Sequence, residues 1–462
     1  MLKRYIGDKA FYRRTLIIAL PIILQNLISN FVGMLDNIMV GQLATAQISA
    51  VTIVNNNLLF IYMLCMFGCV SCGGIFTTQF HGSNDQEGIR YTFRFKVLSC
   101  LLVSALSVAI FWFGGDNLIL LYLQGEGDAA LAADTLFYGR QYLRLMLIGL
   151  IPFAMSNVYA STLRECGHPT LPMIAGIIAM LVNLVGNYIL IFGHFGAPAM
   201  GVAGAAIATV VSRYVELGIL IAWTHVNQEK NPYIRGVYRS FRMPAPLLKQ
   251  ILIKGLPLLL NETMFSAGLA FLNQCYSLCG LDVIPALSIS STIYNMTAVV
   301  FRSLGISVGI LTGQMLGANL PESEIRDSNR KQIALCIVSG VAFGGVTALL
   351  CNSFPQIFQT TDEVRQLAGS LILISAACMP LHAYIMPAYF TLRSGGKTGI
   401  TLLFDSGSIW LLMLPLAFCL TRFTDMPIIP VYILCNSMDI IKCFIGVLLI
   451  RSGSWIQNLT VK

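Results

Sequence analysis

Carboxylate and carboxamide side chains lie inside segments of this chain that are otherwise apolar. Asp36 follows Arg14 by 22 residues, which corresponds to about 33 Å of helix. Asn183 and Asn187 follow His168 by 15 and 19 residues, or roughly 22–29 Å along another helix. The three side chains can therefore meet at a similar depth. Their oxygens suit a hard cation such as Na⁺, and the carboxyl can instead carry H⁺. The alternative is an aspartate that only hydrogen-bonds to neighbouring helices.

Two further carboxylates lie in the second half of the chain at equal depth. Glu262 follows Lys254 by eight residues, and Asp405 follows Lys397 by eight residues, so both lie about 12 Å from a basic segment. If the two face each other, their like charges favour a shared proton, which a cationic ligand would displace. The pair thus predicts a proton or substrate site in this half, and a purely structural role stays open.

Four other ionisable residues occur as two pairs with a spacing of three. Arg213 precedes Glu216, and Asp439 precedes Lys442. Side chains three residues apart lie on one face of a helix, so each pair is predicted to neutralise itself locally.

The remaining reactive side chains favour structural interpretations. His382 is expected to bond to a backbone carbonyl, although it could titrate near neutral pH, and Arg302 has no obvious partner. Cys65, Cys69 and Cys72 share one helix face and are expected to pack between helices as small residues. No second Cys-x-x-Cys motif or histidine pair completes a zinc site.

The segments that carry these residues predict a membrane protein. Of 462 residues, 56% are hydrophobic and 11% are charged, whereas an ordinary soluble domain is about 25% charged. The net charge of +8 is spread over loops, which argues against a nucleic-acid partner. Apolar runs of about 20 residues or more predict twelve spans. They cover 15–40, 48–80, 95–114, 135–163, 169–192, 201–225, 250–279, 283–315, 331–351, 365–392, 398–420 and 427–450.

The basic residues predict the orientation of the spans. With the N-terminus inside, 22 of the 29 Lys and Arg residues lie in inner segments or at the ends, and outer segments receive only Arg365 and Arg422. The outer segment between spans 3 and 4 is acidic instead, with Asp116, Glu126 and Asp128. This asymmetry predicts that both termini are cytoplasmic.

The two halves of the chain contain related motifs. Gly74-Ile75-x-Thr77-x-Gln79-x-x-Gly82-x-Asn84 recurs 235 residues later as Gly309-Ile310-x-Thr312-x-Gln314-x-x-Gly317-x-Asn319. Shorter echoes are Thr162-Leu163-Arg164 with Thr391-Leu392-Arg393, and Leu20-Pro21 with Leu256-Pro257. We therefore expect an all-α membrane protein whose twelve transmembrane helices form two pseudo-symmetric six-helix lobes, 1–225 and 250–462. The basic segment 226–249 would join them as a cytoplasmic linker, and such lobes suit alternating access.

The order and spacing of several motifs resemble the multidrug and toxic compound extrusion (MATE) family over essentially the whole chain. The opening helix from Leu20-Pro21 to Asp36 is similar to that family's first helix. So are Leu163-Arg164-x-x-Gly167, the Asn183–Asn187 segment and the two Gln-x-x-Gly elements that end spans 2 and 8.

The resemblance implies a secondary active antiporter that exports amphipathic, often cationic, drugs or metabolites in exchange for Na⁺ or H⁺. Asp36 matches the family's coupling carboxylate, whereas Asn187 stands where some relatives have aspartate, which leaves the choice of ion open. No cofactor other than the coupling ion is implied. We expect a monomer in the cell inner membrane, with small-molecule substrates and membrane lipid as its partners.

Three other functions are disfavoured by the sequence. Gly396-Lys397-Thr398 imitates the end of an ATP-binding phosphate loop, but Thr391 stands where the first glycine is required. A membrane-embedded enzyme would need a nucleophile–base or metal cluster, which the spacing does not provide. A lipid-linked oligosaccharide flippase of related architecture remains the nearer alternative, although Arg302 is the one obvious cation for its cavity.

The charge asymmetry makes a testable prediction about topology. In a variant without native cysteines, a single cysteine placed in 226–249 should react with an impermeant maleimide only from the cytoplasmic side. A single cysteine in 116–128 should react only from outside. The reverse pattern of labelling would overturn the orientation.

Overall fold

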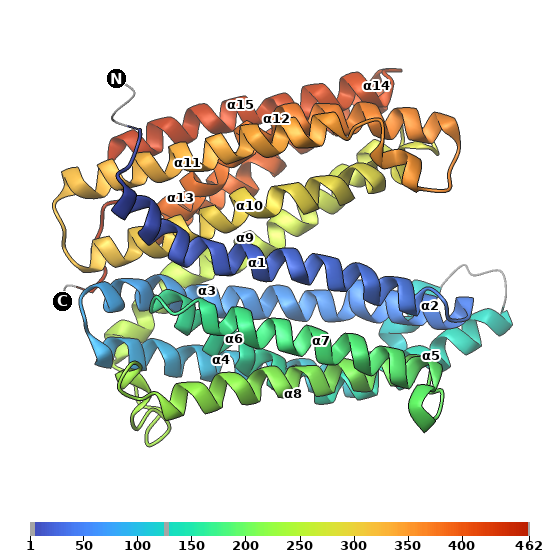
Figure 1. The fold of residues 1–462 in the computed structure, drawn as a ribbon. Coiled ribbons are helices and arrows are strands. Elements are labelled where there is room, and N and C mark those ends of the chain that lie inside the picture. Colours follow the sequence, from blue (N-terminus) through green and yellow to red (C-terminus); the bar gives the residue numbers. More distant parts are fainter. Residues whose placement is uncertain (1–4, 124–128, 461–462) are drawn as a thin grey trace. The chain divides into compact units, whose positions relative to one another are not determined.

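Every regular element in the described residues of the computed structural model, 5–123 and 129–460, is helical. Glu126 and Asp128 of the acidic outer segment lie outside these residues. The helices of the first half are α1 Lys9–Val40, α2 Thr45–Ile53, α3 Phe60–Gly82, α4 Gln86–Leu123, α5 Ala129–Ile148, α6 Leu150–Glu165, α7 Thr170–Phe192 and α8 Val202–Val226. Those of the second half are α9 Ala245–Ser277, α10 Val283–Gly317, α11 Glu322–Leu349, α12 Asp362–Ser394, α13 Thr398–Leu402, α14 Leu414–Phe423 and α15 Ile428–Ser452 (Figure 1).

These helices reproduce the twelve predicted spans. Eleven helical stretches in the described residues are long and apolar enough to cross a membrane. The twelfth span is the pair α5–α6, which bends by 45° at a break next to Gly149. Two spans are continuous but locally underwound: π-helical turns at Val54–Leu59 link α2 to α3, and those at Leu403–Gly407 and Ile409–Met413 link α13 to α14. Such π-turns are frequent at functional sites.

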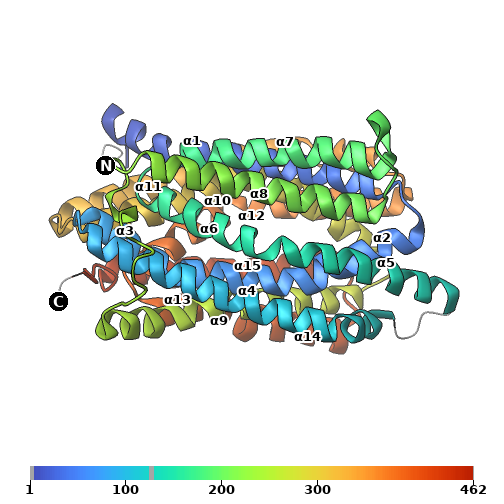
Figure 2. The same cartoon turned by 90° about the horizontal axis from the view of Figure 1, so that it is seen from below.

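The chain folds into two compact units. The N-terminal unit consists of Leu24–Thr77 and Asp85–Lys249. In it α7 packs along α8, α4 packs on α6, and α5 contacts both α2 and α8 (Figure 2). The segment after α8 is held against the start of α4, because Arg94 donates hydrogen bonds to the carbonyls of Gly236 and Val237 at 3.1 and 2.8 Å.

The C-terminal unit consists of Met1–Ile23, Thr78–Asn84 and Gln250–Lys462. Its central element is α12, which packs against α10, α11 and α15 (Figure 1). The unit also contains the first part of α1 and the last turns of α3. Ile18 and Ile22 of α1 pack against Ile310 and Leu311 of α10.

The two copies of the internal motif contact each other within the C-terminal unit. A Cβ on Gly82 would overlap the carbonyl oxygen of Gln314, and a Cβ on Gly317 would overlap that of Gln79. The backbones therefore cross at a distance that only glycine allows. Asn84 and Asn319 follow with φ of 58° and 56°, in the left-handed region where asparagine is tolerated.

This crossing predicts different effects for two glycine substitutions. Gly317→Ala should destabilise the protein by about 1–3 kcal/mol, because the new methyl group must displace the backbone of Gln79. Gly345→Ala in α11 is the control, since its methyl would meet open space and it should gain helix propensity of about 1 kcal/mol. Thermal unfolding of the purified proteins in detergent measures both. Equal stability of the two variants would contradict the reciprocal contact.

Candidate functional site

The structure brings the three predicted side chains of the first half together. Asp36 lies on α1, and Asn183 and Asn187 lie one turn apart on α7. The Asn187 amide nitrogen donates hydrogen bonds to a carboxylate oxygen of Asp36 and, at 3.3 Å, to the Asn183 oxygen. Asn183 in turn donates to the hydroxyl of Thr209 on α8 at 3.1 Å. The four side chains form one network, with Asp36 half-buried and Asn187 completely buried.

One acceptor of this network has no hydrogen-bond donor among the described residues. The Oδ1 atom of Asn187 is buried beside the Asp36 carboxylate and receives no hydrogen bond. A buried amide oxygen without a partner is costly, particularly beside a negative charge. Carboxylate and carboxamide oxygens, which Asp36, Asn183 and Asn187 contribute to this network, are the ligand types that a small hard cation prefers.

Further polar groups surround this network. Tyr142 of α5 exchanges hydrogen bonds with Asn55 at 3.0 and 3.2 Å and interacts electrostatically with Asp36. Asn55 lies in the π-helical turn Val54–Leu59, so this wider turn carries one of the polar groups around the network. Tyr142 also interacts electrostatically with Arg213 of α8, whose guanidinium packs over the Phe153 ring at 4.3 Å.

In the second half, Asp405 has a buried counter-ion. Its carboxylate accepts a hydrogen bond from Lys442 Nζ at 2.8 Å and one from the Asn261 amide at 3.1 Å. Asn261 also accepts from the Ser406 backbone and hydroxyl at 3.2 and 2.7 Å. The π-helical turn Leu403–Gly407 thus presents consecutive polar residues to α9 and α15. The ion pair thus compensates the charge of Asp405, and each of its oxygens accepts a hydrogen bond.

Glu262 lies next to this network on α9. It interacts electrostatically with Arg393 and with Asp405, but no hydrogen bond or ion pair holds its carboxylate within the described part of the chain. The two acids therefore lie close enough to sense each other. Only Asp405 has a counter-ion in direct contact.

The prediction of a local Asp439–Lys442 pair is wrong. Lys442 binds Asp405, and Asp439 instead accepts a 2.8 Å hydrogen bond from Nε2 of His382 on α12. The backbone-carbonyl partner expected for His382 is also wrong, because its Nδ1 lies 2.9 Å from the hydroxyl of Tyr294. Partners on other helices replace the local ones because both side chains of α15 face into the unit.

The other two expectations are also revised. Arg213 and Glu216 interact electrostatically, but their side chains form no ion pair in the regions that the structure covers, and the ring of Phe153 covers Arg213 instead. Arg302 does have partners, both neutral: it donates to the Asn295 oxygen at 3.3 Å and packs over Tyr294.

One buried ion pair of the N-terminal unit was not predicted from the sequence. Lys96 of α4, whose side chain is 0% exposed, binds Glu165 of α6 at 2.5 Å. Gly73 and Gly74 of α3 make room for the pair, since a Cβ on either would meet one of its side chains at 2.8 and 2.6 Å. The sequence feature that could have indicated this pair is the adjacent glycines Gly73 and Gly74, together with a lysine, Lys96, at the edge of an apolar run.

Comparisons with known proteins are consistent with this arrangement. A family model described as MatE matches residues 21–189 and 257–419. A probable multidrug resistance protein NorM of Thermotoga maritima is 23% identical over 445 residues, covering 95% of this chain and 92% of the relative. The multidrug resistance protein PmpM of Pseudomonas aeruginosa is 27% identical over 427 residues, covering 91% and 86%.

Solved structures share the fold. An outward-facing multidrug resistance MATE family transporter of the MOP superfamily superposes with a TM-score of 0.84 at 18% identity, covering 98% of both chains. The Vibrio cholerae MATE transporter VcmN in its bent form gives a TM-score of 0.84 at 18% identity, covering 98% of this chain and 99% of the other. The predicted twelve-helix architecture is thereby confirmed.

The Lys442–Asp405 pair predicts a strong coupling between two substitutions. Lys442→Met leaves an unpaired charge in a buried site and should cost about 3–5 kcal/mol. Adding Asp405→Asn should restore most of the loss, because the remaining amide needs no counter-ion. The control is Arg140→Gln, which breaks a pair with Asp116 whose side chains are more than 40% exposed and should cost at most about 1 kcal/mol. Thermal unfolding in detergent provides the comparison, and additive losses would contradict the pairing.

Proposed function

Because this chain belongs to the MatE family of membrane transporters, we propose that it is a secondary active antiporter for small molecules. It would export amphipathic, often cationic, drugs or metabolites in exchange for Na⁺ or H⁺. The names of its relatives, which are multidrug resistance proteins, support this class of substrate. They give no support to an oligosaccharide flippase. The proposed location is the cell inner membrane, with both termini cytoplasmic and the protein acting as a monomer.

The observation that carries the proposal is the buried oxygen of Asn187 beside Asp36. An ion at this position would bind the second oxygen of Asp36 and the free oxygen of Asn187, and Asn183 would supply a third. A proton on Asp36 needs no such ligands. The spare acceptor therefore favours Na⁺ over H⁺ as the coupling ion.

Coupling then follows from the cost of charge in the membrane. A bare Asp36 carboxylate is expensive to enclose in a low-dielectric unit, and binding of a cation removes its charge. A conformational change that encloses the site is therefore favoured when an ion or a cationic substrate occupies it. A site that binds one or the other exchanges them across the membrane. We propose that the lobes 1–225 and 250–462 move relative to each other in this exchange, with 226–249 as their linker.

The C-terminal carboxylates are proposed to contribute a second site for a proton or a cationic substrate. Glu262 is the better candidate for direct binding, because no side chain in the described residues neutralises it by direct contact, whereas Lys442 holds Asp405. Asp405 would act by positioning the helices around Glu262.

Transport by purified protein in proteoliposomes tests the coupling. With ethidium as substrate, an imposed Na⁺ gradient should drive transport by the wild type, and Asp36→Asn should abolish it while leaving insertion intact. Asn187→Ala removes one ligand of the ion, so it should raise the Na⁺ concentration for half-maximal rate by about tenfold. Glu262→Gln should slow transport of cations more than that of a neutral dye.

Asp116→Asn is the matched control, since it removes a carboxylate from an exposed ion pair between α4 and α5. Normal gradient-driven transport by Asp36→Asn would reject the coupling role of Asp36. Transport driven by a pH gradient alone, with no response to Asn187→Ala, would identify H⁺ as the coupling ion.

A further inference from the structure

A cleft with a volume of about 390 Å³ opens between α11 and α15 in the C-terminal unit. Both helices pack against α12, and Tyr384 of α12 lines the cleft between them. The walls of the cleft are apolar along the helices, with Ile333 and Ile337 on α11 and Val447 on α15. It is therefore a groove that runs along the helix axes.

The mouth of the groove is strongly basic. Three arginines line it, Arg326, Arg330 and Arg451, and no carboxylate belongs to its described lining. Arg326 is engaged, because it binds Glu322 at 2.6 Å and donates to the carbonyl oxygen of Arg451 at 2.9 Å. The guanidinium groups of Arg330 and Arg451 are exposed, and they form neither an ion pair nor a hydrogen bond with the residues the structure covers.

These arginines lie near the ends of two helices that are long and apolar enough to cross a membrane, which is where lipid headgroups are expected. Arg326 and Arg330 occupy the first three turns of α11, and Arg451 is the penultimate residue of α15. The apolar walls lead from these helix ends toward the middle of the spans. The neighbouring side chains Val338 and Leu448 are 65% and 53% exposed, so this face of both helices is apolar and open, as the lipid-facing side of a span is expected to be.

Contacts within the chain hold the floor of the groove in place. Trp455 is 1% exposed, and its indole nitrogen donates to the carbonyl oxygen of Ile450 at 3.0 Å. Gly453 has φ of +68°, and a Cβ there would overlap the guanidinium of Arg326. The end of α15 is thus fixed by Trp455 on one carbonyl and by Arg326 on the next.

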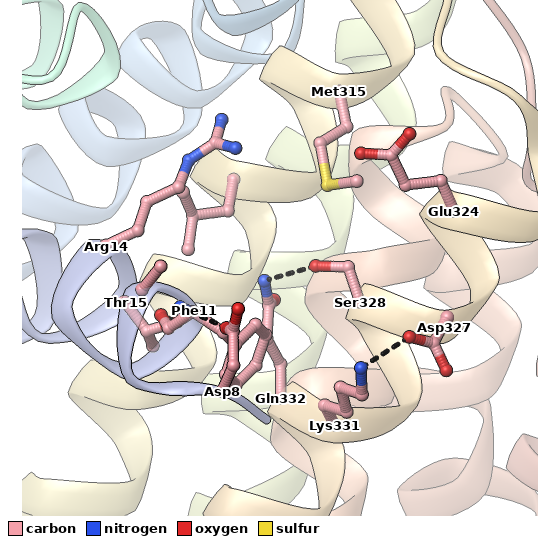
Figure 3. Close-up of a pocket in the computed structure, with 12 residues that line it drawn as sticks. Asp8, Phe11, Arg14, Thr15, Met315, Glu324, Asp327, Ser328, Lys331 and Gln332 are labelled. Carbon is pink, nitrogen blue, oxygen red and sulfur yellow. Dashed lines mark hydrogen bonds and ion pairs between the residues drawn. The ribbon is translucent and has the colours of Figure 1, made fainter. Parts of the chain in front are cut away.

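A second pocket on another face of α11 provides a contrast. It has a volume of about 280 Å³, and its lining carries charges of both signs (Figure 3). Lys331 is neutralised there by Asp327 at 2.6 Å, and Glu324 and Asp8 line the same pocket. This pocket offers no net positive charge to an anion, although it lies at the same end of α11.

We propose that the groove between α11 and α15 binds one anionic phospholipid. The planar guanidinium groups of Arg330 and Arg451 would hold the headgroup phosphate by paired hydrogen bonds, a geometry for which arginine is suited. One acyl chain would lie against Ile333, Ile337 and Val447. Basic pockets between transmembrane helices at the membrane surface have this chemistry, and the anionic lipid would bridge α11 and α15.

Binding can be measured on the full-length protein in detergent. Phosphatidylglycerol should remain bound at one molecule per chain in native mass spectrometry and should raise the thermal unfolding temperature. Phosphatidylcholine with the same acyl chains should do neither. Arg330→Gln and Arg451→Gln should each weaken phosphatidylglycerol binding by about fivefold, and the double variant by about 25-fold. Both side chains are exposed, so the variants should fold.

Lys331→Gln is the matched control, because it removes one positive charge from the adjacent position of the same helix without touching the groove. It should bind phosphatidylglycerol as the wild type does. Equal binding of the two lipids, or equal loss in Lys331→Gln, would overturn the proposal. A stabilisation by inorganic phosphate equal to that by phosphatidylglycerol would show an anion site that takes no lipid, and would overturn it as well.

Discussion

Ionisable side chains inside these helices must find their partners within the protein, because lipid supplies neither hydrogen bonds nor dielectric screening. Three such pairs connect segments that are distant in sequence: Lys96 with Glu165, Lys442 with Asp405, and His382 with Asp439. Each pair fixes the rotation of two helices about their axes. The hydrophobic effect alone would not fix these rotations, because lipid tails solvate leucine and valine as well as a neighbouring helix does. The polar contacts therefore decide which face of each helix points into its unit.

Close approach of backbones is the second requirement, and glycine provides it at the places where the sequence repeats. Gly82 and Gly317 are equivalent positions of the internal motif. Each leaves room for the carbonyl oxygen of the glutamine in the other copy of the motif. Gly73 and Gly74 make room for the buried Lys96–Glu165 pair in a similar way. In a membrane, where packing and hydrogen bonds rather than hydrophobic burial hold helices together, small residues at a crossing are a source of stability. The repeated motif is therefore a packing element as well as a sign of duplication.

The sequence predicted the helices well and their rotations poorly. Apolar run length and loop charge suffice to place twelve spans, because the bilayer imposes one length on all of them. Depth along a helix follows from the number of residues and the rise per residue, and it correctly brought Asp36 to the level of Asn187. Rotation about the axis does not follow from either quantity, so the spacing predicts Asp439 as the partner of Lys442, whereas Lys442 binds Asp405 on another span. Spacing describes neighbours on the same helix, whereas buried charges select partners across helices.

Exceptions to this internal pairing are informative because they are costly. Several buried oxygens have no donor among the described residues. Tyr233 and Asn231 lie in the segment between α8 and α9, outside the spans, and a lone hydroxyl such as that of Ser290 is neutral and can reorient. Asn187 differs, since its free oxygen lies in a span beside a carboxylate, where a bound cation is the simplest compensation. Arg330 and Arg451 are the opposite case, because they are positive groups without a counter-ion in the described residues and lie beside an apolar groove at a helix end. In both cases the charge beside the site, negative on Asp36 and positive on the two arginines, is opposite to that of the ligand proposed for it.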